Sequence, residues 1–167
     1  MTNSDFVPTD LSTIREMDEH VVHPWESFDR PNTSRTIIGS GAGVYVYDDQ
    51  GNRLLDGPGG MWCVNVGHGR QEIADAIADQ AAQLSYTSPW SHPTAPAARL
   101  ADRLSSVAPG DLDHVFYTTG GSTAIDSALR FCLFYNNVLG RPEKKQFITR
   151  HDAYHGSTYL SAAVCGK

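Results

Sequence analysis

Residues 114–135 join a short apolar strand to a long amphipathic helix, with two glycines between them. Val115-Phe116-Tyr117-Thr118 is β-branched and aromatic, which is typical of a buried strand. From Ser122 onward the apolar residues recur at intervals of three and four, the period of one helix face: Ile125, Ala128, Leu129, Cys132 and Leu133. The change of period at 119–121 predicts a strand that turns directly into a helix, with Ser122 or Thr123 as the N-cap.

A turn of this kind is a potential phosphate cradle. The first N–H groups of a helix have no intrahelical partner, and glycine lets another group approach the backbone closely. A plain connection that binds nothing is the simpler alternative. A nucleophile elbow is a third, because Gly120-x-Ser122-x-Ala124 approximates the G-x-S-x-G pattern of serine hydrolases without its last glycine.

Helices and strands alternate in the second half of the chain, which predicts βαβ units and a parallel sheet with covered faces. Helices are expected at about 70–84 and 95–107, and another strand at 146–149. Ligands of such sheets bind beyond the carboxyl ends of the strands. The turn at 119–122 and the loop at 151–156 are therefore candidates for one site. Ser157, after the second loop, is expected to cap a last helical run.

The first 70 residues follow a different pattern. After a loose start at 1–9, a helix capped by Asp10 or Ser12 is expected to about Val22. A small antiparallel unit is expected from three strands, at 36–38, 44–47 and 53–56. In the glycine-rich loop that follows, Trp62 is interpreted either as a core plug or as a pocket wall.

Charge and composition exclude several functions. The net charge of the 167 residues is −6, which argues against nucleic acid and against an anionic membrane surface as partners. No apolar run is long enough to span a membrane, and the start is unlike a secretory signal. Cys63, Cys132 and Cys165 have unrelated spacings, which indicates buried reduced thiols and a cytoplasmic protein.

Two histidine patterns imitate metal sites. His20 and His23 lie three residues apart without a third ligand nearby, so packed or helix-end histidines are the simpler interpretation. His151-Asp-Ala-Tyr-His155 imitates the zinc pattern H-E-x-x-H, but Asp152 replaces the essential glutamate and a glycine follows at once. We expect no metal site.

Together these stretches resemble the N-terminal part of a class III aminotransferase, a pyridoxal-phosphate enzyme of fold type I. The subgroup that they resemble is the ω-amine:pyruvate aminotransferases. The most specific segment is Gly60-Met-Trp-Cys-Val-Asn-Val-Gly-His-Gly-Arg70; His20–Pro24, Ser91–Pro93, Val115–Tyr117 and Tyr154–Gly156 follow the family's order. The resemblance implies an α/β fold, with 1–70 as an N-terminal segment and 71–167 as the start of the cofactor-binding large domain, whose mostly parallel sheet is incomplete here.

The resemblance also implies a cofactor site. Gly120, Gly121 and Ser122 fall in the family's S-G-S-E-A motif and would hold the phosphate of pyridoxal 5′-phosphate, although Gly120 replaces a serine and Thr123 a glutamate. Tyr154 would lie flat against the pyridine ring, with His155 beside it. The substrate pocket would be walled by a further aromatic set: Trp62 with Tyr86 or Trp90.

The same resemblance implies what the chain does not supply. The family's Schiff-base lysine lies further on, and Lys144, Lys145 and Lys167 do not match its position. The expected function is the N-terminal part of a homodimeric enzyme that moves an amino group from an amine or ω-amino acid to a keto acid such as pyruvate. The 167 residues are expected to be inactive alone. A serine hydrolase acting through Ser122 and a catalytically inert fragment are the alternatives.

Overall fold

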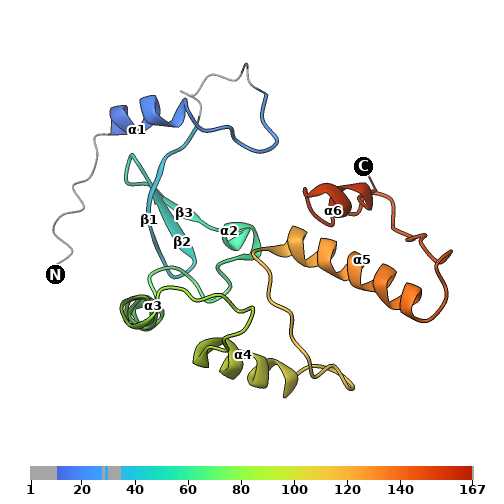
Figure 1. The fold of residues 1–167 in the computed structure, drawn as a ribbon. Coiled ribbons are helices and arrows are strands. Elements are labelled where there is room, and N and C mark those ends of the chain that lie inside the picture. Colours follow the sequence, from blue (N-terminus) through green and yellow to red (C-terminus); the bar gives the residue numbers. More distant parts are fainter. Residues whose placement is uncertain (1–10, 28, 30–34, 167) are drawn as a thin grey trace. The chain divides into compact units, whose positions relative to one another are not determined.

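The structure is a computed structural model that describes residues 11–27, 29 and 35–166 (Figure 1). The chain divides into two compact units, Met1–Tyr86 and Thr87–Lys167. Elements of the first unit are α1 (Leu11–Asp18), β1 (Ile38–Ala42), β2 (Tyr45–Asp48), β3 (Arg53–Leu55), α2 (Gly59–Trp62) and α3 (Gln71–Gln83). Those of the second are α4 (Ala95–Ser105), α5 (Gly121–Val138) and α6 (Tyr159–Ala163).

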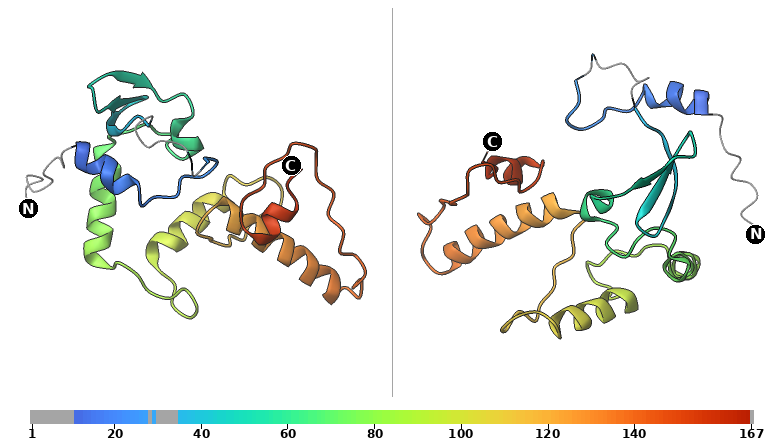
Figure 2. Two further views of the ribbon diagram at one scale, coloured as in Figure 1. Left: turned by 90° about the horizontal axis from the view of Figure 1, so that it is seen from above. Right: turned by 180° about the vertical axis from the view of Figure 1, so that it is seen from behind.

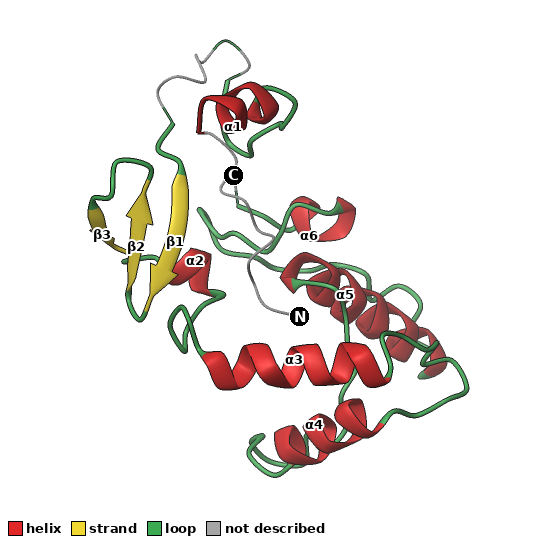
Figure 3. Cartoon of the chain, turned by 90° about the vertical axis from the view of Figure 1, so that its left-hand side faces the viewer, coloured by secondary structure: helices red, strands yellow, loops and turns green. Residues whose placement is uncertain are grey.

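The strands of the first unit form an antiparallel sheet in the order β1–β2–β3 (Figure 3). The turn between β2 and β3 is closed by Asp48, whose carboxylate accepts the Asn52 side-chain amide at 3.0 Å and the backbone N–H of Asn52 and Gln50. These bonds stabilise the ionised form and lower the pKa of Asp48. The expected antiparallel unit is confirmed. Its first strand lies at Ile38–Ala42 rather than at 36–38, because the pairing with β2 runs from Ile38 to Ala42.

The expected helices are present with shorter bounds. α3 and α4 lie within the ranges 70–84 and 95–107. α1 ends at Asp18 rather than near Val22. Residues 1–10, which include the expected loose start and Asp10, lie outside the described residues, as does the side chain of Ser12.

α5 begins before the expected N-cap. Gly120 is the N-cap, with an extended backbone at φ 173° and ψ 173°, so Ser122 is already the second residue of the helix. The predicted N-cap at Ser122 or Thr123 is therefore wrong, because the extended residue that starts the helix is the glycine itself. Three members of the predicted stripe, Ile125, Leu129 and Leu133, are half-buried, while Ala128 and Cys132 are exposed.

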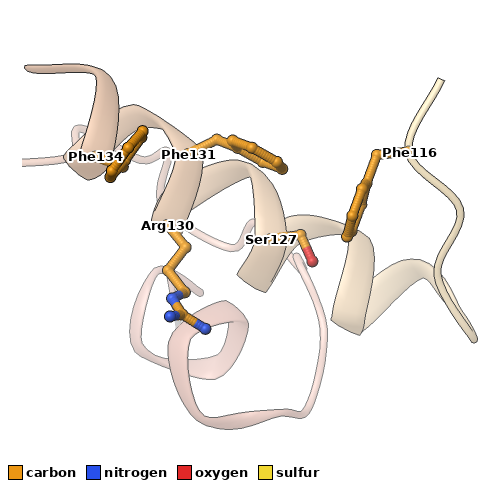
Figure 4. A pocket seen from close by; sticks show the side chains of 5 residues that line it. All are labelled: Phe116, Ser127, Arg130, Phe131 and Phe134. Atoms are coloured by element: carbon orange, nitrogen blue, oxygen red, sulfur yellow. The ribbon is translucent and has the colours of Figure 1, made fainter. Parts of the chain in front are cut away.

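The strands expected at 115–118 and 146–149 are wrong for the part of the chain that the structure describes. Neither segment has regular secondary structure, because neither has a neighbouring strand with which to form a hydrogen-bonded ladder. Phe116 instead packs against α5, its ring centroid 5.4 Å from that of Phe131 in an edge-to-face arrangement. The two rings line a groove of about 260 Å³ together with Ser127, Arg130 and Phe134. Figure 4 shows the side chains of these five residues.

α2 is a left-handed turn. Gly59, Gly60, Met61 and Trp62 have φ between 57° and 68°. The Trp62 N–H donates to the Pro58 carbonyl at 2.9 Å, and the Cys63 N–H donates to the Gly59 carbonyl at 3.1 Å. A left-handed helical backbone costs about 1–2 kcal/mol per residue that carries a side chain. Strain of this kind persists only where surrounding contacts fix it, and such places are frequently functional.

Among the described residues, the buried ones lie in α6 and in the loop before it. α6 contacts α5, and the two helices lie side by side in both views of Figure 2. Ser161 has no exposed surface, and Gly156 is also buried. Among residues 13–27, 29 and 35–166, no hydrophobic side chain is fully buried. The prediction of buried thiols is accordingly wrong: Cys63 and Cys132 are exposed and Cys165 is half-buried, because the described residues do not enclose a core around them.

No described helix is both long enough and apolar enough to cross a bilayer.

Candidate phosphate-binding site

The start of α5 presents backbone N–H groups that nothing in the described chain occupies. Its first intrahelical hydrogen bond runs from the Ala124 N–H to the Gly120 carbonyl at 3.0 Å, so the N–H groups of Gly121, Ser122 and Thr123 precede it. A Cβ built on Gly120 or Gly121 would meet no atom within 4 Å. Open space therefore lies beside the two glycines that precede these donors, and N–H groups at a helix start fit an anionic phosphate group.

The peptide between Gly120 and Gly121 is held by three donors. Its carbonyl accepts the Ala124 N–H, the Thr123 hydroxyl at 2.8 Å and the Thr118 hydroxyl at 3.1 Å. Because the C=O and N–H of a trans peptide point in opposite directions, this arrangement turns the Gly121 N–H away from the three donors. Thr123 thus acts on the cradle through the backbone.

Ser122 has a hydroxyl that links the cradle to a distant segment. Its Oγ accepts the backbone N–H of Ser157 at 3.1 Å. A hydroxyl has one proton to donate in addition to its lone pairs, so the Ser122 O–H remains able to donate to an anion. We call the N–H groups of residues 121–123 together with this hydroxyl the phosphate cup.

The segment 154–157 lies beside the phosphate cup. A Cβ built on Gly156 would stand 2.6 Å from Ser122 Oγ, which shows how closely the two backbones approach. The structure therefore brings together the two loops that the sequence places at one sheet edge. Further along, the Ser161 N–H donates to Asp126 Oδ1 of α5 at 2.7 Å.

Tyr154 and His155 precede this contact directly. The Tyr154 side chain is 55% exposed, so much of its surface can still be covered by a ligand. His155 is half-buried, its Nε2 lies 3.1 Å from the Thr149 hydroxyl, and its backbone N–H donates to Cys165 Sγ at 3.3 Å. Their roles toward a cofactor ring stay predictions.

The aromatic residues expected to wall a substrate pocket are exposed. Trp62 is 74% and Tyr86 78% exposed in the first unit, and Trp90 is 93% exposed in the second. Trp62 therefore plugs no core among the described residues. Its part in a pocket stays a prediction.

A contact between two side chains closes the loop that carries Trp62. His68 Nε2 lies 2.9 Å from Asp56 Oδ2, and the Gly60 N–H donates to Asp56 Oδ1 at 3.3 Å. The bond from His68 is the largest cause that lowers the pKa of Asp56, followed by the bond from Gly60. His68 also pairs with Gly43 through two backbone hydrogen bonds, of 2.8 and 3.0 Å.

Several of these contacts were missed by sequence reasoning. Asp56, His68, Asp126 and Ser161 were not predicted as part of any site. A signal existed for Asp126, which lies four residues after Ser122 and so faces the same side of the helix. No local pattern points to Ser161 or to the pairing of His68.

Two alternatives to a phosphate site find no support in the geometry. The hydrogen bond recorded for the Ser122 hydroxyl comes from a backbone N–H, and no histidine contacts it among the described residues, as a nucleophile would require. His23 is paired with Asp18 at 2.8 Å. Within the described ranges, no three metal-ligating side chains cluster.

Comparison with known proteins gives consistent matches. The family model described as "Aminotransferase class-III" matches residues 28–167. The putrescine–pyruvate aminotransferase of Pseudomonas aeruginosa is 38% identical over 152 residues, which are 89% of this chain and 33% of that protein. The chain spans about a third of the length of its curated relatives.

Two solved structures are similar in fold and sequence. A transaminase from the marine bacterium Virgibacillus matches with a TM-score of 0.88 and 36% identity, over 92% of this chain and 36% of that one. An (S)-enantioselective ω-transaminase from Thermomicrobium roseum matches with a TM-score of 0.89 and 31% identity, over 93% of this chain and 36% of that one.

Proposed function

Because the chain belongs to the class-III aminotransferase family, we propose that it forms the cofactor-phosphate site of an enzyme that moves an amino group from an amine or ω-amino acid to a keto acid such as pyruvate. Enzymes of this family depend on pyridoxal 5′-phosphate. The observation that carries the proposal is the phosphate cup at the start of α5, whose N–H groups precede the first intrahelical hydrogen bond and adjoin two glycines with open space beside them.

The phosphate cup would anchor the cofactor by its phosphate. The backbone N–H groups of Gly121 and Ser122, with the Ser122 hydroxyl, would donate to the phosphate oxygens, while Gly120 leaves room for them. Charge-assisted bonds of this kind are stronger than neutral ones, and the dipole of α5 favours an anion at its N-terminus. When bound, the cofactor supplies an electron sink for the carbon that bears the amine.

Tyr154 and His155 would face the cofactor ring. Their segment is joined to the phosphate cup by the bond from Ser157 to Ser122, which supports this placement. The exposed face of Tyr154 would cover the ring and exclude water from it. Trp62, Tyr86 and Trp90 would wall the amine pocket, and the name of the P. aeruginosa relative supports an amine donor with pyruvate as acceptor.

Further parts of the proposal concern the whole protein. We propose that 1–70 forms an N-terminal segment and 71–167 the start of the large domain, and that the enzyme is a cytoplasmic homodimer. Residues 1–167 would be inactive alone, because neither Lys144 nor Lys145 matches the position of the family's Schiff-base lysine. Lys167 does not match it either and lies outside the described residues.

The test is amino transfer by the purified full-length protein. With putrescine and pyruvate, we expect alanine to form only when pyridoxal 5′-phosphate is present, and Ser122→Ala to raise the cofactor concentration needed for half-maximal rate. A fluorophosphonate probe addresses the serine hydrolase: labelling of Ser122, with no alanine from any amine donor, would contradict the aminotransferase.

A further inference from the structure

We propose that Asp126 is a positioning residue that holds the segment carrying Tyr154 and His155 on the phosphate cup. The inference rests on the proposed function, since the phosphate cup and the ring-facing segment have roles only toward the cofactor. Asp126 itself touches neither the phosphate cup nor the ring. It acts through Ser161, by a chain of contacts that runs from Asp126 through Ser161 and Gly156 to Ser122.

The first contact is a hydrogen bond between elements 35 residues apart: the Ser161 N–H donates to Asp126 Oδ1 at 2.7 Å. Ser161 is the third residue of α6, so its N–H is one of those that an α-helix leaves without an internal partner. Thr158, the N-cap of α6, makes no side-chain capping bond. A carboxylate of α5 therefore does the capping, and its charge suits the N-terminus of the helix.

This bond is shielded from water. Ser161 has no exposed surface and Asp126 is half-buried. The Ser161 hydroxyl lies 2.8 Å from the Thr158 hydroxyl, so this buried hydroxyl has a hydrogen-bond partner. α6 has only five residues, too few for a stable isolated helix, so its position depends on contacts with α5.

Gly156 transmits this position to the phosphate cup. A Cβ on Gly156 would stand 2.5 Å from Ser161 Oγ and 2.6 Å from Ser122 Oγ, so the glycine is packed between the two serines. This fit requires Ser161 to stay close to α5. The next N–H, of Ser157, then reaches the Ser122 hydroxyl at 3.1 Å.

Ser122 and Asp126 thus hold one segment at two points. They lie four residues apart on α5 and face the same side. The two points, at 157 and 161, lie two and six residues after His155. Removal of the Asp126 carboxylate would free one point and loosen the ring-facing segment, while the N–H groups of the phosphate cup keep their own geometry.

The experiment compares two ligands on the full-length apoenzyme. Pyridoxal 5′-phosphate contacts the phosphate cup and the ring-facing segment, whereas inorganic phosphate contacts the phosphate cup alone. For Asp126→Ala we expect the dissociation constant of the cofactor to rise about tenfold, the scale of one lost charge-assisted hydrogen bond. The constant for inorganic phosphate, measured by competition, should change less than about twofold. The visible circular dichroism of the bound cofactor should weaken, since its ring is less fixed.

Two further variants sharpen the result. Asp126→Asn keeps an oxygen acceptor and should restore most of the cofactor affinity and the dichroism. Asp102→Ala, which removes an exposed carboxylate of α4, should leave the dissociation constants of both ligands unchanged. Should Asp126→Ala fail to fold, Asp126→Leu takes its place, because leucine has a similar volume and no acceptor oxygen. A rise in the dissociation constant of the cofactor alone supports the proposal, and no change in either constant overturns it.

The outcomes separate the proposals. Equal weakening of cofactor and inorganic phosphate in Asp126→Ala would overturn the positioning role, because Asp126 would then act on the phosphate cup itself. Unchanged cofactor binding would also overturn it, while the proposed function would stand. If the unaltered protein bound neither ligand, the proposed function would fail and this inference with it.

Discussion

His68 Nε2 lies 2.9 Å from Asp56 Oδ2, at the far end of the loop that carries Met61 and Trp62. The same carboxylate accepts the Gly60 N–H, and the Asp56 carbonyl accepts the Gly59 N–H at 3.1 Å. One residue therefore holds both the end of the loop and the first residues of its left-handed turn. This accounts for the persistence of a backbone that Met61 and Trp62 disfavour.

The Asp56 pair predicts an acid-sensitive loop. The pKa of Asp56 is lowered in the folded protein, chiefly by the bond to His68. Its contribution to stability is complete above the ordinary aspartate pKa of about 3.9 and is lost as the pH falls through the lowered value. Thermal melts of the full-length protein from pH 6 to pH 3 should show a steeper acid loss than melts of Asp56→Asn. Asp79→Asn, an exposed control on α3, should keep the original slope.

Gly156→Ala should disrupt the contact between segment 154–157 and α5. The added Cβ would stand 2.5–2.8 Å from atoms of Ser161 and Ser122, at a φ of 141° that disfavours any side chain. We expect a loss of about 1–3 kcal/mol in the free energy of unfolding, measured by urea denaturation. A variant as stable as the original protein would mean that the two segments do not pack as described.

Gly121→Ala should separate stability from binding. Its Cβ meets nothing within 4 Å, and alanine favours a helix over glycine by up to about 1 kcal/mol. The melting temperature should therefore hold or rise. The same methyl group would take up part of the open space beside the phosphate cup, so the dissociation constant of pyridoxal 5′-phosphate should rise by about tenfold. Undiminished cofactor affinity would show that the phosphate lies elsewhere.

Met61→Gly should stabilise the protein, because it relieves a left-handed backbone at φ 57°. The relief of about 1–2 kcal/mol is partly offset by the entropy of glycine, which leaves a net gain of about 0.5–1 kcal/mol. Met17→Gly is the matched control: Met17 is similarly exposed but lies in the right-handed α1, where glycine should cost about 1 kcal/mol. An equal loss of stability in Met61→Gly and Met17→Gly, measured by thermal melts, would refute the backbone strain at Met61.

Trp62→Ala should change amine preference with little loss of stability. Trp62 is 74% exposed, whereas alanine in place of a buried tryptophan costs about 3–5 kcal/mol. The measurements are kcat/KM for a series of amines of increasing size and a thermal melt. Trp25→Ala, which removes a tryptophan of comparable exposure in the same unit, should leave the order of amines unchanged. A large fall in the melting temperature of Trp62→Ala, with the ranking of amines by kcat/KM unchanged, would refute the pocket role.

Local pattern was sufficient for much of the fold. The apolar period of α3, α4 and α5 and the turn at Asp48 predicted those helices and the antiparallel unit, since both depend on near neighbours in sequence. The α/β fold of fold type I is confirmed by the structural relatives. Strands at 115–118 and 146–149 could not be judged in this way, because a strand forms only with a partner.

The site was less accessible to prediction. The glycine turn before α5 was found because glycine and a period change are local signals. Its N-cap was misplaced by two or three residues, since serine outranks glycine in that role and the structure uses Gly120. The bond from Ser161 to Asp126 joins residues 35 apart, and nothing in either neighbourhood specifies the other. The left-handed Met61 and Trp62 run against the preference of their own side chains.

The three donors on the Gly120 carbonyl make the phosphate cup preorganised. Its N–H groups are oriented before any ligand arrives, so little reorganisation opposes binding. The proposed receptor would recognise a phosphate ester by its charge and oxygens and would have no means to distinguish one ester from another. Discrimination between cofactors must then come from the ring-facing segment, so affinity and selectivity would be divided between two stretches of chain that can change independently.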